Sequence, residues 1–223
     1  VANIATSGLR IITTVDRALQ EQALYSLRHD LSRLDVRLRG YEREEVQKEL
    51  SELNYGGDTT LKKHAFLFGK VLDNAGEKDG SYKVTVDLGK KFGTGVIDHK
   101  GLTRLVTARA RFKENNPWHE VKVKDYRNFI KQLEKDDLVW VSVRGRTEND
   151  NILLELEKFP EVNGGALVLK DGEIKAVAGG VENRFYNRAI YAKRTMGSSF
   201  KPFVFAAALQ LGWNSADRLR NAR

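Results

Sequence analysis

Cysteine is missing from the 223-residue sequence, and proline and methionine are rare, with three residues and one residue. Without cysteine the chain can form neither a disulfide nor a thiolate metal site. The four histidines, His29, His64, His99 and His119, lack the spacing of a ligand motif, so we expect surface histidines, no metal and no cofactor. No run of 18 apolar residues occurs, so no segment of this sequence is expected to span a membrane.

Hydrophobic residues make up 41% of the chain, which allows a buried core in one large domain or two small ones. The net charge of +8 raises the question of nucleic-acid binding. Residues 58–160 mix both signs of charge, whereas residues 161–223 carry 10 basic and 5 acidic side chains. The middle of the chain is therefore not a basic stripe, and the positive C-terminal part suits either an anionic substrate or an ordinary soluble surface.

The first 57 residues predict a short strand followed by two helices. Leu9–Val15 is rich in β-branched residues, which favours a strand, and Asp16 is placed to cap a helix that Gly40 ends. The helix has apolar residues at helical spacing, which predict a face turned to the core: Leu19, Ala23, Leu27, Leu31 and Leu34. A second amphipathic segment, Tyr41–Leu53, ends at a turn-rich stretch that we take as a domain boundary.

From Ala65 the hydrophobic period changes to two, which indicates strands. The predicted strands are Ala65–Leu72, Tyr82–Leu88, Leu102–Phe112, Leu138–Arg144 and Ile152–Leu156, with Gly95–Asp98 as a possible sixth. Between the third and fourth runs, Asp125–Glu134 has a helical face that we expect to close one end of a barrel, formed by Tyr126, Phe129, Ile130 and Leu133. Five strands with a helix before the fourth is the chain order of an OB-fold.

Aromatic residues in this barrel could stack on the bases of single-stranded nucleic acid, as those of OB-folds do. Four of them alternate inside apolar runs and are expected in the core instead: Phe66, Phe68, Tyr82 and Trp140. Phe92 and Trp118 lie in polar loops and are the better candidates for a contact surface.

Near the C-terminus, a predicted β-hairpin precedes a candidate nucleophile. Asp171-Gly172 forms a turn signal between two apolar runs of residues 166–178. Further on, Ser198 and Lys201 are three residues apart at the start of a predicted helix and share one face. A lysine held neutral by burial could accept the serine proton while Ser198 Oγ attacks a carbonyl, and the amides at the helix start would favour the resulting oxyanion.

The residues around Ser198 resemble the opening of the transpeptidase domain of bifunctional (class A) penicillin-binding proteins. The similarity lies in Gly179-Gly180 ending the hairpin, Asn187-Arg188-Ala189, and Gly197-Ser198-Ser199-Phe200-Lys201-Pro202. Gly8–Asp16 is similar to the strand that this family carries before the domain. The family's Ser-x-Asn and Lys-Thr/Ser-Gly elements have no counterpart in these 223 residues, and we expect the chain to be a fragment.

The resemblance implies an α+β fold in three parts. Residues 1–57 would be a linker strand and helices, residues 58–160 an OB-like β-barrel, and residues 161–223 the truncated N-terminal part of the transpeptidase domain. The first and third parts would form one discontinuous unit into which the barrel is inserted.

The same resemblance implies peptidoglycan synthesis by a serine-type D,D-transpeptidase, with Ser198 and Lys201 as catalytic residues and β-lactams as covalent inhibitors. Cross-linking and carboxypeptidase hydrolysis both remain open. Stem peptides would be the substrates, and other cell-wall proteins could bind the OB-like domain. The enzyme would lie at the periplasmic face of the cytoplasmic membrane, attached through a missing N-terminal segment.

The implied fragment would be inactive alone, because parts of the active site lie outside these residues. Two alternatives to the enzyme remain. The OB-like domain could be an interaction module for proteins, or it could bind single-stranded nucleic acid, although no nucleic acid is expected under the first hypothesis.

Overall fold

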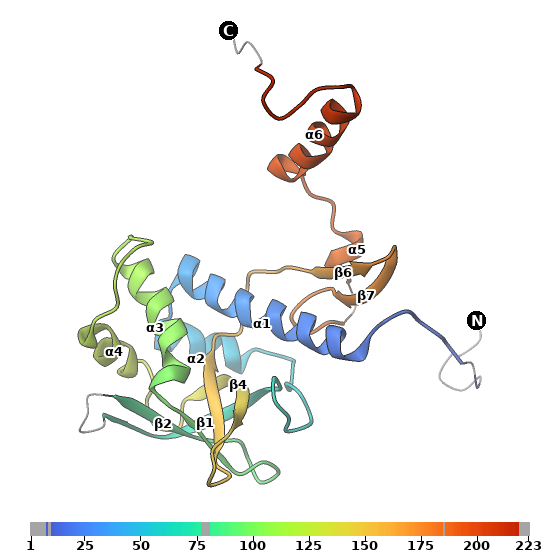
Figure 1. The fold of residues 1–223 in the computed structure, drawn as a ribbon. Coiled ribbons are helices and arrows are strands. Elements are labelled where there is room, and N and C mark those ends of the chain that lie inside the picture. Colours follow the sequence, from blue (N-terminus) through green and yellow to red (C-terminus); the bar gives the residue numbers. More distant parts are fainter. Residues whose placement is uncertain (1–7, 9, 77–80, 185, 219–223) are drawn as a thin grey trace. The chain divides into compact units, whose positions relative to one another are not determined.

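The computed structural model describes residues 8, 10–76, 81–184 and 186–218 (Figure 1). The chain divides into two units, residues 1–190 and residues 191–223. The elements of the first unit are, in chain order, α1 (Arg17–Arg39), α2 (Arg43–Ser51), β1 (Phe66–Gly76), β2 (Tyr82–Asp87), β3 (Thr94–Ile97), α3 (His99–Lys113), α4 (Val123–Ile130), β4 (Leu138–Arg146), β5 (Ile152–Glu157), β6 (Ala166–Lys170), β7 (Glu173–Ala178) and α5 (Arg188–Tyr191). The second unit contains a 3₁₀ turn, η1 (Gly197–Phe200), and α6 (Lys201–Gln210). The predicted α+β class is confirmed, and no helix in the described ranges is long and apolar enough to cross a bilayer.

The first five strands form a closed barrel in the order β1-β2-β3-β5-β4. All neighbours are antiparallel except β3 and β5, which run parallel, with Val96 opposite Leu153. A five-stranded Greek-key barrel with helical residues between its third and fourth strands matches the OB-like prediction. The short run at 95–98, predicted only as a possible strand, supplies β3.

The predicted strand Leu102–Phe112 was wrong, because these residues belong to helix α3. Asp98 caps the helix, its Oδ1 accepting a hydrogen bond from the Gly101 amide at 2.7 Å. Leu102, Leu105 and Val106 are all buried, and this i, i+3, i+4 face packs the helix on β5 and β3. Alternating apolar residues in the same stretch imitate a strand, but the cap and the helical face favour the helix.

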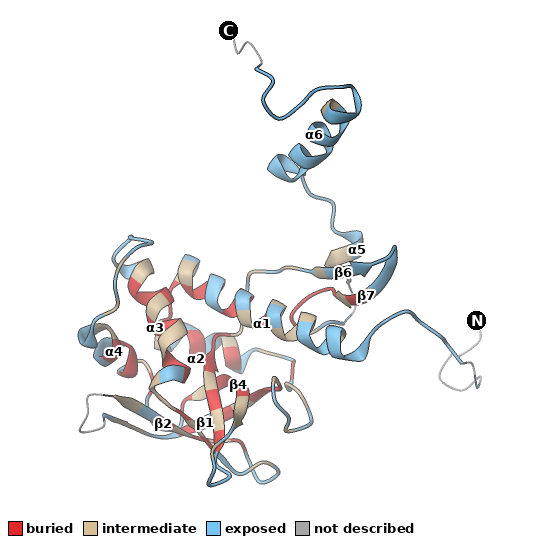
Figure 2. Cartoon of the chain, in the orientation of Figure 1, coloured by how far each residue is buried: buried red, intermediate tan, exposed pale blue. Residues whose placement is uncertain are grey.

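The core contains aromatic as well as aliphatic residues. Figure 2 shows buried residues in red on the barrel strands and on the helices beside them. Phe66 and Trp140 are completely buried, with ring centroids 4.7 Å apart, which confirms them as core residues. The predicted apolar residues of 125–134 are confirmed as buried, namely Tyr126, Phe129, Ile130 and Leu133, but the helix ends at Ile130, so Leu133 lies beyond it. This helix, α4, packs on α3, and α3 makes the more extensive contact with the barrel strands.

Helix α1 begins and ends as predicted but buries a different face. Asp16 caps it by accepting a hydrogen bond from the Leu19 amide, and Gly40 ends it at a φ of 81°. Leu31 is buried, yet Leu19 is 41% and Leu34 44% exposed, so the predicted core face was wrong in part. The buried positions of the helix are Arg28, Leu31, Ser32, Asp35 and Val36.

The hairpin of residues 166–178 is confirmed as antiparallel β6 and β7. Asp171 and Gly172 both have positive φ, at 53° and 80°, as a two-residue hairpin turn requires. Helix α1 packs against both strands and also against α3, so it connects the hairpin to the barrel module within the first unit.

The segment before α1 was expected to be a strand near this hairpin. Leu9 lies outside the described residues, and residues 10–15 form no strand, so that prediction was wrong. The segment nevertheless contacts β7, because Thr14 Oγ1 and the Asp16 amide donate to consecutive carbonyl oxygens of that strand, at 2.8 and 2.9 Å. The Gln20 side-chain amide donates to the Val177 carbonyl oxygen and accepts from the Val177 amide. The Gln20 side chain therefore takes the position that a neighbouring strand would have beside β7.

Candidate functional site

The predicted nucleophile lies at the start of the second unit. Ser198 is the second residue of η1, which Gly197 enters at a φ of 52°, and Lys201 is the first residue of α6. The Lys201 amide donates to the Ser198 carbonyl oxygen. In a 3₁₀ turn the side chains of residues i and i+3 lie on the same edge, so the backbone is suited to holding the serine and the lysine together.

Both candidate side chains are exposed in the second unit, and so is almost all of α6. The helix is apolar on every side, with Phe203 66%, Phe205 65% and Leu209 59% exposed. The second unit therefore exposes an apolar surface, although a helix with this composition is normally buried. A neutral lysine amine needs a desolvated surrounding, which the described part of this unit does not provide.

Sequence reasoning missed a row of buried polar residues on α1. Arg28 is 4% exposed and donates from Nε to the Val181 carbonyl oxygen at 2.7 Å. Its Nη atoms bind the Asp58 carboxylate at 3.0 Å and the Tyr55 hydroxyl at 2.7 Å. This arginine therefore joins α1 to the entry of the barrel and to the segment after β7.

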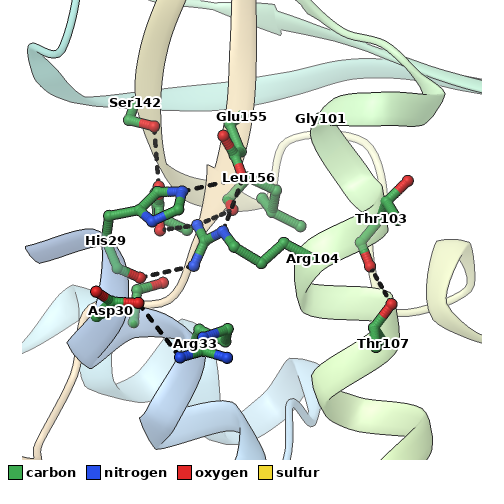
Figure 3. A network of polar contacts seen from close by, with 12 residues as sticks. His29, Asp30, Arg33, Gly101, Thr103, Arg104, Thr107, Ser142, Glu155 and Leu156 are labelled. Carbon is green, nitrogen blue, oxygen red and sulfur yellow. Dashed lines mark hydrogen bonds and ion pairs between the residues drawn. The ribbon is translucent and has the colours of Figure 1, made fainter. Parts of the chain in front are cut away.

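The next residue of α1, His29, joins a network with α3 and β5 (Figure 3). Arg104 of α3 binds Glu155 from Nε at 2.7 Å and Glu157 from Nη2 at 2.5 Å, and its Nη1 donates to the His29 carbonyl oxygen. His29 Nε2 lies 3.3 Å from Glu155 Oε1, and Ser142 donates to Glu157 at 2.8 Å. Every carboxylate in the network therefore has a cationic or hydrogen-bonding partner.

The pKa values of the two carboxyls shift in opposite directions. Burial raises the pKa of Glu155, but the hydrogen bond from His29 and the charge of Arg104 together lower it further than burial raises it. Glu157 is completely enclosed, and burial raises its pKa despite the Arg104 contact.

His29, Glu155 and Glu157 bring one possible ligand atom each within 4.8 Å of one another. Arg104 already donates to both carboxylates, so a guanidinium group supplies the positive charge that a metal ion would bring. We conclude that these residues form a structural ion-pair network. The prediction that the histidines are surface residues was wrong, because all four are half-buried: His29, His64, His99 and His119.

A third connection lies near the C-terminal end of α1. Asp35 is fully buried and accepts a hydrogen bond from Lys158 Nζ at 2.6 Å, and Lys158 itself is 2% exposed. Asp35 also accepts from the amides of Glu161 and Val162, while Ser32 accepts from the Lys158 amide. The chain leaving the barrel is thereby attached to α1. A spacing of i, i+4, i+7 for Arg28, Ser32 and Asp35 was the available sequence signal.

The sequence of the chain is similar to those of several known proteins. No protein-family model matches the chain. Penicillin-binding protein 1A of Pseudomonas aeruginosa is 30% identical over 97% of the chain and 25% of its own length. Penicillin-binding protein 1A of Vibrio cholerae is 27% identical over 97% of the chain and 26% of its own length. The namesake from Neisseria gonorrhoeae is 41% identical over 63 residues, or 26% of the chain. The chain thus spans about a quarter of the length of the first two relatives.

Proposed function

We propose that this chain, which is homologous to penicillin-binding protein 1A over 97% of its length, is part of a peptidoglycan-synthesising enzyme in which Ser198 is the acyl-transfer nucleophile. The observation that carries the proposal is the position of Ser198 in a 3₁₀ turn three residues before Lys201, at the entry of an apolar helix. Homology alone would support a general role in peptidoglycan synthesis. The Ser-x-x-Lys geometry supports the reaction type.

The reaction is an acyl transfer in two steps. Ser198 Oγ attacks the carbonyl carbon between the two terminal D-alanines of a stem peptide, while the neutral Lys201 amine accepts the serine proton. An ester forms at Ser198, the peptide C–N bond breaks, and the departing D-alanine takes up the proton. The amine of a neighbouring stem then displaces Ser198 to give a cross-link. Water in place of that amine gives carboxypeptidase hydrolysis.

A β-lactam would acylate the same oxygen, because its strained amide is attacked in the same way and opens to an ester on Ser198. The enzyme would act at the periplasmic face of the cytoplasmic membrane, where its substrate lies. Under this proposal residues 1–57 and 161–223 belong to one transpeptidase unit that carries the barrel of residues 58–160 as an insert. The contacts of α1 with the hairpin support this grouping for residues up to 190.

The OB-like barrel is proposed to bind other proteins of the cell wall. The nucleic-acid alternative finds little support, since Phe66 and Trp140 are completely buried and cannot stack on bases. Trp118, in contrast, is 84% exposed and is available for a contact.

The proposal is tested by labelling the full-length gene product with a fluorescent penicillin. We expect the parent protein to be labelled and the Ser198→Ala variant to lose the label. Ser199→Ala is the matched control, because Ser199 is the next residue in the same turn and should leave labelling intact. Lys201→Ala should slow labelling by about 100-fold or more, as expected for loss of a general base. Labelling of Ser198→Ala at the parent level would refute the assignment.

A further inference from the structure

A groove between α1 and α3 contains two arginines that have no carboxylate partner. Arg37 of α1 and Arg111 of α3 are half-buried and line this groove, whose volume is 330 Å³. Arg111 donates one long hydrogen bond, 3.4 Å, to the His119 carbonyl oxygen. The Arg37 side chain has no hydrogen bond or ion pair within the described part of the chain.

This is unusual for the first unit. Six other arginines of this unit, which are buried or half-buried in its helices and in β4, lie within 3.5 Å of a carboxylate oxygen. They are Arg28, Arg39, Arg43, Arg104, Arg109 and Arg144. No aspartate or glutamate lines the groove. Arg33, also in the lining, pairs with Asp30 at 3.3 Å, and both of these side chains are exposed. Arg104, the fourth arginine of the lining, pairs with Glu155 and Glu157. The uncompensated positive charge of the groove therefore comes from Arg37 and Arg111.

Three apolar residues share the lining of the groove with the arginines. Leu34 of α1 is 44% exposed within the lining, and Ala108 and Pro117 lie beside it. Trp118 follows Pro117 and is 84% exposed, while its amide donates to Asn116 Oδ1 at 2.9 Å and fixes the turn. Tryptophan and arginine are among the residue types that dominate binding energy at protein interfaces.

We propose that this groove binds an acidic segment of a partner protein, in which an apolar side chain is flanked by aspartates or glutamates. The apolar side chain would cover Leu34 and contact Trp118. The flanking carboxylates would receive paired N–H bonds from Arg37 and Arg111, for which the planar guanidinium group is well suited. An inorganic anion alone would leave Leu34 and Trp118 exposed. The site is independent of the chemistry at Ser198.

The test begins with a library of phage-displayed random dodecapeptides selected on the full-length gene product. We expect enriched peptides to carry aspartate or glutamate on both sides of a leucine, isoleucine or aromatic residue. The best peptide, labelled with a fluorophore, is then titrated against variants. Arg37→Glu/Arg111→Glu should weaken its binding at least tenfold, and Trp118→Ala should weaken it several-fold.

Two variants keep the result interpretable. Arg127→Glu makes a similar charge reversal at an exposed arginine of α4 outside the groove and should leave peptide affinity unchanged. Arg37→Gln/Arg111→Gln removes the charges without reversing them and, because neither arginine has an ion pair to lose, should keep the fold and still lose affinity. The proposal is overturned if no peptide is enriched, if enriched peptides lack acidic residues, if the double variants bind normally, or if inorganic phosphate displaces the peptide at equal concentration.

Discussion

Phe129 shows how one side chain holds α4 in the core. It is 1% exposed, its ring centroid lies 5.0 Å from that of Tyr41, and the Arg109 guanidinium carbon lies 6.0 Å from its ring. The helical spacing of this residue was readable from the sequence, and the burial followed. The contacts of its ring with Tyr41 and Arg109 were not readable from the sequence, because each of these residues comes from a different helix or loop.

We expect Phe129→Ala to lower the free energy of unfolding by about 3–5 kcal/mol, because it removes a buried ring and leaves a cavity. Urea denaturation followed by circular dichroism measures this loss. Trp118→Ala, at a residue 84% exposed, is the control and should change the free energy of unfolding by less than about 0.5 kcal/mol. A loss below about 1 kcal/mol for Phe129→Ala would contradict its place in the core.

At Glu155 we expect a pH-dependent contribution to stability. Its pKa lies below the ordinary value in the folded chain, so the folded state binds fewer protons than the unfolded state. The contribution is present above the unfolded pKa of about 4.3 and is lost as the pH falls through the folded pKa. Urea denaturation between pH 7 and pH 3 should therefore show a smaller acid-induced loss for Glu155→Gln than for the parent chain. An equal loss in both proteins would show that this carboxyl contributes nothing.

At the scale of elements, three polar contacts hold α1 to its neighbours in addition to its apolar residues in the core. Arg28, the His29 network and Asp35 lie in succession along the helix and bind the barrel, its exit and the segment after β7. A buried ion pair is sensitive to the loss of one partner, because the remaining charge stays buried without compensation.

Asp35→Ala should therefore lower the free energy of unfolding by about 3–5 kcal/mol, since it leaves the Lys158 ammonium buried with only Glu49 nearby, at 3.5 Å. The double variant Asp35→Leu/Lys158→Met should recover much of this loss, because both charges are removed. Glu21→Gln breaks exposed ion pairs with Arg17 and Lys62 and should leave the free energy of unfolding almost unchanged. The comparison uses urea denaturation, and a double variant less stable than Asp35→Ala would contradict this view of α1.

The sequence allowed the barrel strands and the hairpin to be predicted, because period-two runs and an Asp-Gly turn are local signals. The sequence did not distinguish a helix from a strand at 102–112, because its apolar residues fit both the helical and the strand period. The Asp98 cap favours the helix there. The polar face of α1 was missed for a different reason. The spacing of Arg28, Ser32 and Asp35 places them on one helical face, but their burial depends on partners far along the chain, which this spacing does not identify.

At the scale of the whole molecule, the chain spans about a quarter of the relatives it matches, and this bears on activity. Ser198 and Lys201 are exposed in the second unit, and the family's Ser-x-Asn and Lys-Thr/Ser-Gly elements are not among these 223 residues. We therefore expect the 223-residue chain by itself to remain unlabelled by fluorescent penicillin under conditions in which the full-length gene product reacts completely. Stoichiometric labelling of the shorter chain would show that the missing elements are dispensable.

Mass spectrometry of the penicillin-treated full-length gene product identifies the acylated residue. The protein is digested, and the peptide containing residues 195–201 is sequenced by fragmentation. We expect one penicilloyl group per molecule, carried by Ser198 and absent from Ser199. A stoichiometric adduct on any other residue, with Ser198 unmodified, would contradict this expectation.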